Sequence, residues 1–278
     1  MTAPTTISPG TLDVHVVADA GGRTRATRLH QRYPQRVTTP LYCDPTRPWA
    51  ATLCVQSPSG GTFSDDDLMT AVRCGPGTEL HLTTQAATQV FAGDGPGSRH
   101  RLGFVIGAGA QLEYCPGTVI PHAGAAFTQQ IRVEVDTGGL YLGWEAVAAG
   151  RIAHGERFGF ARYDSTFVLR VDGRAVARDR QVIQPCDGRA GRLIDGDYLA
   201  TFVAVTPGRP TCALLQDIRQ ALGDCHGGAS PLPADVGVFV RLVARNAPAL
   251  GRVRDRVFAA CRAWSRSAAS TLTPGQAP

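Results

Sequence analysis

Short stretches of alternating apolar and polar residues, separated by glycine and proline, recur along the first three quarters of the chain. Leu12, Val14 and Val16 alternate with polar neighbours, which is the pattern of a half-buried β-strand. Similar stretches lie at 51–56, 68–74, 79–84, 102–106, 111–115, 128–136, 140–148, 166–171 and 201–205. Strands and turns that repeat about every dozen residues predict a mainly β fold, as a sandwich, a barrel or a coiled stack of sheets.

The last quarter of the chain predicts two helices around one strand. Thr211 is a suitable N-cap for the first helix, and Gly223 follows its last apolar residue. Residues 235–245 alternate as a strand, and Pro248 then opens the second helix, where a missing N–H does no harm. The apolar residues of this helix recur every three or four positions and predict one packed face: Leu250, Val253, Val257, Cys261 and Trp264.

We therefore expect one domain over residues 11–264, strand-rich at 11–206 and helix-strand-helix at 211–264, with flexible tails at 1–10 and 265–278. The length of 278 residues and the hydrophobic fraction of 43% fit a globular chain of this size. The sequence lacks a signal peptide and a long apolar run, so we expect neither export nor a membrane span.

Charge and cysteine usage narrow the expected partners and location. The net charge is +5, and every basic residue is arginine. The arginines are dispersed and are usually near an acid, so we expect no nucleic-acid partner. The eight cysteines form no C-x-x-C pair, which favours buried thiols in a reducing cytoplasm.

Common catalytic motifs are missing from the sequence. There is no G-x-S-x-G and no H-E-x-x-H, and a phosphate loop of the G-x-x-x-x-G-K-[ST] type is excluded because there is no lysine. Cys225-His226 is the one adjacent cysteine–histidine pair, in an expected glycine-rich loop. This pair is compatible with an ordinary loop and with a metal-binding loop, and both interpretations remain open.

Three carboxylates have unusual neighbours. Glu113 and Glu145 lie among apolar residues on expected strands, and Glu156 follows a glycine in GRIAHGERFGF. A carboxylate in such surroundings needs a cation or several donors, or else its pKa shifts. Arg151, Arg157 and Arg162 are natural partners. Buried Arg–Glu pairing, acid–base catalysis and transient metal ligation all remain open.

The segment LTTQAATQVF at residues 82–91 is polar but almost uncharged. Its side chains are poor nucleophiles and poor metal ligands. Thr83, Thr84, Gln85 and Thr88 can hydrogen-bond where strands stack and turn, and the two alanines between them allow close approach of a neighbouring segment. We interpret it as architecture.

Five segments in order resemble the urease accessory protein UreD family. Together with the closing VFVRLVARNAPAL they cover most of the chain. The segments are Gln31-Arg32-Tyr33-Pro34 with Pro40-Leu41-Tyr42, Pro58-Ser59-Gly60-Gly61 with Asp66-Asp67-Leu68, residues 82–91, Leu112-Glu113-Tyr114-Cys115-Pro116 with Ile120-Pro121, and Gly150-Arg151 with His154-Gly155-Glu156-Arg157-Phe158.

The resemblance implies a non-enzymatic chaperone or scaffold that acts with UreF and UreG, binds apo-urease and assists GTP-dependent nickel insertion. It also implies a strand-rich, β-helix-like stack of sheets with two α-helices in the C-terminal quarter. No cofactor would be permanently bound, and nickel would be in transit. The matching motifs imply a nickel path near Asp66, Glu113 and Glu156, and structural or partner-related roles for Thr83, Thr84, Gln85 and Arg151.

The chain departs from the family pattern after TTQAAT, where Gln89, Phe91 and Ala92 stand in place of lysine, tyrosine and arginine. We expect any change of partner specificity there. Two other functions stay open from the residues: a β-helix hydrolase that uses two of these acids, such as Glu113 and Glu156, as paired carboxylates, and a free-standing metal binder at Cys225-His226.

Overall fold

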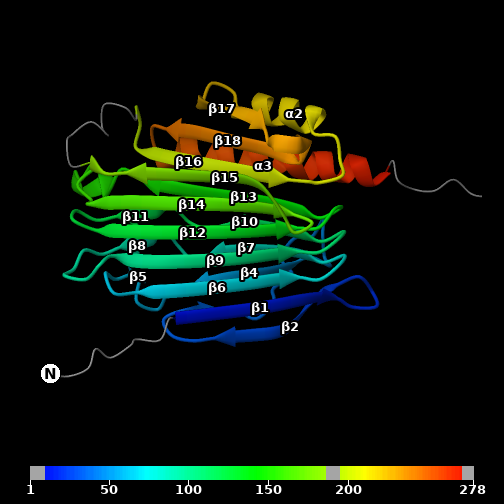
Figure 1. Cartoon of the computed structure of the whole chain (residues 1–278), viewed down its shortest axis with the longest axis horizontal. Helices are drawn as coiled ribbons and strands as arrows, with labels where there is room; N and C mark the ends of the chain where they lie inside the picture. Colours follow the sequence, from blue (N-terminus) through cyan, green and yellow to red (C-terminus); the bar gives the residue numbers. More distant parts are fainter. Residues whose placement is uncertain (1–9, 186–194, 271–278) are drawn as a thin grey trace, which may run out of the picture.

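The computed structural model describes residues 10–185 and 195–270, which form two stacked β-sheets and two α-helices (Figure 1). The seven-stranded sheet has the order β15-β14-β12-β9-β6-β1-β2. Its strands are β1 (Gly10–Ala18), β2 (Thr24–Gln31), β6 (Asp67–Cys74), β9 (Ser98–Ile106), β12 (Ala126–Val135), β14 (Arg162–Val171) and β15 (Arg174–Ile183).

The eleven-stranded sheet has the main order β17-β18-β16-β13-β10-β7-β4-β3, and three short strands branch from it. The main strands are β3 (Arg36–Val37), β4 (Ala51–Gln56), β7 (Glu79–Thr84), β10 (Gln111–Cys115), β13 (Leu140–Ala148), β16 (Tyr198–Val205), β17 (His226–Pro231) and β18 (Gly237–Ala244). The short strands are β5 (Gly61–Thr62), β8 (Thr88–Val90) and β11 (Val119–Pro121).

The chain passes back and forth between the sheets, so strands from successive turns pair in parallel. β6, β9, β12 and β14 pair in parallel in one sheet, and β4, β7, β10 and β13 do so in the other. Inward-facing residues of both sheets form the main core, which includes Val14, Phe104, Leu112 and Tyr141. The expected mainly β stack with two helices is confirmed.

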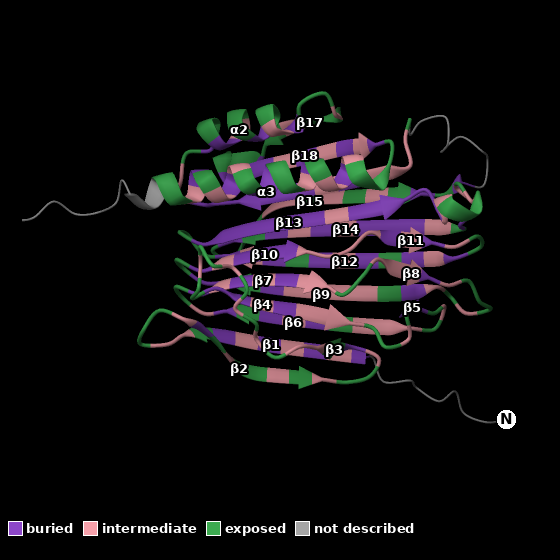
Figure 2. Cartoon of the chain, turned by 180° about the vertical axis from the view of Figure 1, so that it is seen from behind, coloured by how far each residue is buried: buried purple, intermediate pink, exposed green. Residues whose placement is uncertain are grey.

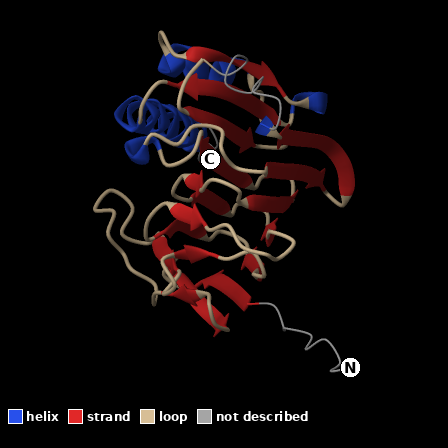
Figure 3. Ribbon diagram, turned by 90° about the vertical axis from the view of Figure 1, so that its left-hand side faces the viewer, coloured by secondary structure: helices blue, strands red, loops and turns tan. Residues whose placement is uncertain are grey.

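Both helices lie at the C-terminal end of the stack, on the outer side of the eleven-stranded sheet (Figures 2 and 3). α2 (Cys212–Leu222) and α3 (Ala247–Ser270) bury their apolar faces against β13, β16 and β18. Asn246 caps α3, because its Oδ1 accepts a hydrogen bond from Ala249 N at 2.9 Å. The expected apolar face of this helix, from Leu250 to Trp264, is buried in this second core.

Alternation located many strands well but missed polar ones. β4, β7, β10 and β13 have the expected bounds. β2, β15 and β17 were not predicted, because these edge strands carry mostly polar or small residues. The strand expected from 235 begins only at Gly237, since a 3₁₀ turn occupies Pro233–Asp235.

Three expectations about ends and caps were wrong. Gly10 is not part of a loose tail: it is buried in β1, where an added Cβ would lie 2.6 Å from Pro34 Cδ. The expected tail at 265–278 begins too early, because α3 continues to Ser270 with residues that tolerate a helix. Thr211 precedes α2, but its hydroxyl bonds Asp235 instead of capping the helix. Residues 1–9 and 271–278 lie outside the described residues.

Candidate functional site

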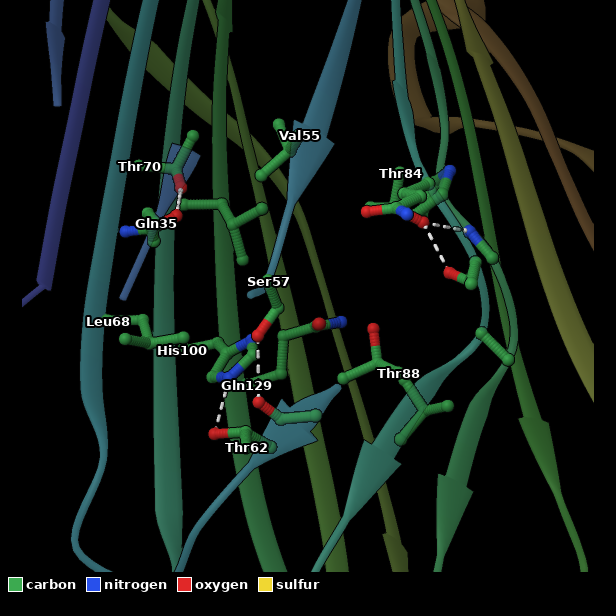
Figure 4. Close-up of a pocket in the computed structure, with 18 of the residues that line it drawn as sticks. Gln35, Val55, Ser57, Thr62, Leu68, Thr70, Thr84, Thr88, His100 and Gln129 are labelled. Carbon is green, nitrogen blue, oxygen red and sulfur yellow. Dashed lines mark hydrogen bonds between the residues drawn. The ribbon is translucent and has the colours of Figure 1, made fainter. Parts of the chain in front are cut away.

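A cavity of about 220 Å³, lined by apolar residues together with a set of polar side chains, lies between the two sheets. Both sheets line it, the seven-stranded sheet with side chains from β6, β9, β12 and β14 and the other with side chains from β4, β7, β10 and β13. Figure 4 shows Gln35, Thr70, His100 and Gln129 facing Thr84 and Thr88. Such interior positions usually carry apolar residues, so a set of polar side chains here is a candidate site.

Glu145 is the carboxylate of this cavity. It lies on the buried strand β13, and it accepts hydrogen bonds from Gln129 Nε2 at 2.6 Å and from Ser165 Oγ at 2.9 Å. No arginine pairs with it among the described residues. Glu145 lines the cavity, and desolvation by the surrounding protein raises the pKa of its carboxyl to about 7.

His100 brings a neutral imidazole to the same cavity. Its Nε2 lies 3.2 Å from Thr62 Oγ1, and its ring packs edge-on against Phe127. Burial lowers the pKa of His100 to about 4, so the imidazole is uncharged at neutral pH. A neutral imidazole can hold a borderline metal ion such as Ni²⁺.

Asp66 lies next to the cavity and is connected to it through Thr62. The Asp66 carboxylate accepts hydrogen bonds from Phe63 N at 2.8 Å and from Thr62 Oγ1 at 3.1 Å. Thr62 and His100 both line the cavity. Of the three carboxylates that the sequence singled out for a nickel path, Asp66 is therefore the one joined to this site.

Glu113 lies on the opposite side of its sheet from the cavity. The next residue, Tyr114, lines the cavity, and alternation along β10 sends Glu113 outward, toward α3. Glu113 is 1% exposed and accepts hydrogen bonds from Arg47 Nη1 at 3.0 Å and from Arg262 Nε at 2.9 Å. Gln111 and His81 donate to it as well, at 2.9 and 3.1 Å.

These contacts decide the ionisation of Glu113. Burial alone would raise its pKa, but hydrogen bonds from Arg262 and His81 outweigh burial and hold the pKa below its ordinary range. Glu113 is thus the acid of a buried Arg–Glu pair. This sealing excludes Glu113 and Glu156 as paired carboxylates of one open hydrolase cleft.

Glu156 lies in a separate place, after the 3₁₀ turn Ile152–His154. It pairs with Arg151, one of its expected partners, which donates from Nε at 2.8 Å and also from Nη2. Arg151 lowers the pKa of Glu156 to about 2. The structure therefore does not bring Asp66, Glu113 and Glu156 together, and the described residues hold no group of three metal-ligating side chains.

The segment LTTQAATQVF forms part of the cavity wall. Thr84 Oγ1 donates to Ala86 O and accepts from Gly117 N, each at 2.8 Å, and Gln85 N donates to Val55 O at 2.9 Å. Thr83 points the other way, and its hydroxyl donates to Cys115 O at 2.7 Å. A groove of about 480 Å³ beside α3 lies on that side. This wall is thus a thin partition between cavity and groove.

Only Cys225 of the Cys225-His226 pair lies in the expected loop. His226 begins the edge strand β17, and Cys225 Sγ lies 3.4 Å from Val243 O. The groove around the pair is also lined by Arg245, Arg252 and Arg256. Asp195 and Asp224 line the same groove, so its charges are mixed, and the described residues there form no group of three possible metal ligands.

Two features of the sequence indicated residues of the cavity, but they did not predict which residues meet there. Glu145 is the acid in the otherwise apolar run LYLGWEAVA, and Gln129 occupies an inward position between Phe127 and Ile131 on β12. The pairing of Glu145 with Gln129 and the inclusion of His100 were missed, because strand alternation does not say which inward residues meet across two sheets.

The fold and the site define a stacked-sheet protein with a cavity between its sheets, lined in part by polar side chains, that holds one carboxylate without a basic partner among the described residues. The family model described as "UreD urease accessory protein" matches residues 8–273, and the chain belongs to this family. It is 64% identical to the urease accessory protein UreD of Mycolicibacterium gilvum over 265 residues, which cover 94% of this chain and 96% of the relative.

More distant relatives carry similar names. Urease accessory protein UreD 2 of Streptomyces griseus is 33% identical over 257 residues, 86% of each chain. Urease accessory protein UreD of Cenarchaeum symbiosum is 27% identical over 256 residues, 87% of this chain and 88% of the relative. The resemblance inferred from the motifs is confirmed.

Proposed function

We propose that this protein is a non-enzymatic urease maturation factor that binds apo-urease together with UreF and UreG and assists GTP-dependent insertion of nickel. The observation that carries the proposal is the Glu145 cavity inside a chain of the urease accessory family. Nickel is the cargo in this proposal, and no cofactor stays bound.

Three donor groups on the cavity wall support the proposal that a nickel ion passes here. The Glu145 carboxylate, the neutral His100 imidazole and the Gln129 amide line one space. Such oxygen and nitrogen donors bind Ni²⁺, whereas a closed set of thiolates would hold it too firmly for transfer. Because Glu145 must lose its proton to bind a cation, nickel affinity should rise as the pH increases through 7.

The three carboxylates expected from the motifs fit a path unequally. Asp66 bonds neutral donors at the cavity's edge, so it is the proposed contact on the way in or out. Glu113 and Glu156 are held by arginines, and both would have to exchange these partners to hold nickel. We place Glu145 ahead of them in the proposed path.

The sequence supports a division of labour with a separate GTPase. The chain has no lysine and thus no phosphate loop of the usual kind, so GTP hydrolysis in this proposal belongs to UreG. None of the described helices has the length and apolar character to span a membrane. All seven cysteines of the described residues are free thiols, which supports the proposed cytoplasmic location.

Deletion of the gene from a host that carries the complete urease operon tests the proposal. We expect urease apoprotein to accumulate without activity, and plasmid-borne protein to restore activation and to co-purify with UreF, UreG and apo-urease. Normal activation in the deleted host, with no second copy of the gene, would reject the proposal.

The residues that depart from the family pattern, Gln89, Phe91 and Ala92, lie close together at the surface. Phe91 stacks on Phe63 and contacts the His122 ring edge-on, while Gln89 Oε1 lies 2.9 Å from His122 Nε2. Ala92 beside them is exposed. We propose that Gln89→Lys with Ala92→Arg changes the affinity for a partner. Equal affinity would leave these positions without a role in partner choice.

A further inference from the structure

The outer face of the seven-stranded sheet is open over most of its area. The side chains of Val72, Phe104 and Val133 point into the core, so the alternate residues of β6, β9 and β12 point outward. Figure 1 looks onto this face, and no helix of the described residues covers it. Parallel sheets are normally covered on both sides, which makes an open parallel face a candidate for a partner.

Strand register gathers arginines on this face that are dispersed in the sequence. Arg132 on β12 lies opposite Gly103 on one side and Val168 on the other, and Val168 lies opposite Arg178 on β15. Arg73 on β6 and Arg99 on β9 point outward on the same face. We name these four residues, Arg73, Arg99, Arg132 and Arg178, the arginine face.

The four guanidiniums of the arginine face carry positive charge that no bonded partner in the described ranges neutralises. All four side chains are exposed, and within the described residues none of the four guanidiniums has a hydrogen-bond or ion-pair partner. The neighbouring acids Asp13, Asp67 and Asp164 are already paired, with Arg28, with Arg101 and with Arg162 and Arg180. Glu134 is the outward acid of β12 without a partner. The unpaired charge is therefore strongly positive.

Small and apolar residues lie between these arginines. Ala71 and Gly103 are neighbours on β6 and β9, and an added Cβ at Gly103 would meet no heavy atom within 4 Å. Met69 and Val105 flank this pair and are 41% and 36% exposed. A low apolar strip with arginine around it has the composition of a protein interface, where Met and Arg are enriched.

The size and charge of the face indicate its occupant. Five strands at about 4.8 Å spacing and about 30 Å length give roughly 700 Å², close to one side of a standard protein interface. A second copy of this chain, with net charge +5, would bring like charge. We infer that the arginine face docks a folded protein that presents aspartate and glutamate side chains, paired bidentately with the guanidiniums.

Direct binding measurements test this inference, which rests on the proposed function for the choice of probes. The probes are purified apo-urease, UreF and UreG, each titrated separately against the full chain at several salt concentrations. The charge variant is Arg132→Glu with Arg178→Glu. Its matched control is Arg245→Glu with Arg252→Glu, exposed arginines on the helical side of the molecule.

We expect one probe to bind with an affinity that falls with salt, and the charge variant to weaken it by about tenfold or more while the control does not. A second pair tests shape without charge. Gly103→Trp should block docking, while Gly228→Trp, which also has open space on the edge strand β17, should not.

Each result separates the alternatives. If the unaltered chain binds a probe and both arginine-face variants bind it equally well, this inference is wrong and the proposed function stands. Absence of binding to all three probes would overturn both. If the charge variant loses affinity only for a short DNA duplex, the face is a polyanion site and the inference is also wrong.

Discussion

Glu113 on strand β10 and Arg262 on the last helix are 149 positions apart and form a buried ion pair, with Arg262 Nε 2.9 Å from Glu113 Oε1. Arg47, which lies in a loop of the N-terminal half of the chain, binds the same carboxylate. The pair thus fixes α3 against the sheet on the side opposite the cavity.

Removal of the Glu113 charge should destabilise the fold. Glu113→Gln would leave Arg47 and Arg262 without their shared counter-charge, and we expect the free energy of unfolding to fall by about 3 kcal/mol at pH 7. Urea denaturation would measure the loss. Glu134→Gln, an outward acid without a partner, is the control and should change stability little. Equal stability of the two variants would show that the pair contributes nothing.

The same pair predicts a loss of stability in acid. The pKa of Glu113 is lower in the folded chain than in the unfolded chain, where it is about 4.3. Its contribution is therefore fully present above that value and is lost as the pH falls below it. The stability difference between the unaltered chain and Glu113→Gln should be constant from neutral pH to about pH 5 and should narrow as the pH falls from there toward 3. A difference that stays constant between about pH 5 and 3 would contradict the assignment.

Glu145 predicts the opposite dependence. Its pKa is raised to about 7 in the folded chain, so ionisation costs stability, and the cost grows as the pH rises from the unfolded value to 7. Glu145→Gln keeps an amide that can bond Gln129 and Ser165 but removes the charge. We expect it to match the unaltered chain below about pH 4 and to exceed its stability by an amount that grows with pH, up to roughly 3 kcal/mol at pH 8. Parallel stability profiles would show that Glu145 titrates normally.

The wall between cavity and groove should be sensitive to one methyl group. A Cβ on Gly117 would lie 2.3 Å from Ala86 O, so Gly117→Ala must displace the Thr84–Ala87 segment. We expect a loss of about 1–3 kcal/mol in the free energy of unfolding. Gly228→Ala, at a glycine with open space, is the control. If both variants are equally stable, the wall is more pliable than its contacts indicate.

Alternation and turn residues were sufficient to predict a mainly β fold, because inward strand positions are mostly apolar. The β-helix-like stack was implied by the family resemblance. Strands such as β15, with the sequence RAVARDRQVI, escaped prediction since one of their sides faces solvent and their edge is unpaired. Thr211 shows a second limit. The residue type is right for an N-cap, but Asp235, 24 positions later, takes its hydroxyl.

The candidate site was predicted less well for a geometric reason. The sequence marked Glu113, Glu145 and Glu156 as acids that need partners, and each has found them. Which side of a strand an acid faces decides whether it meets arginines or a cavity. Adjacent residues Glu113 and Tyr114 face opposite sides, and only the assembled sheets place Glu145 beside Gln129 and His100.

The nickel content of urease matured with Glu145→Gln tests the central proposal most directly. The variant is expressed with the complete operon, urease is purified, and nickel is measured per active site, with Asp94→Asn, an exposed acid without a partner within the described part of the chain, as the control. Co-purification with the partner proteins confirms that the variant still assembles. The proposal predicts that nickel content and urease activity fall together by about tenfold or more, although the variant is at least as stable as the unaltered chain. Full nickel content with Glu145→Gln would contradict a path through this cavity.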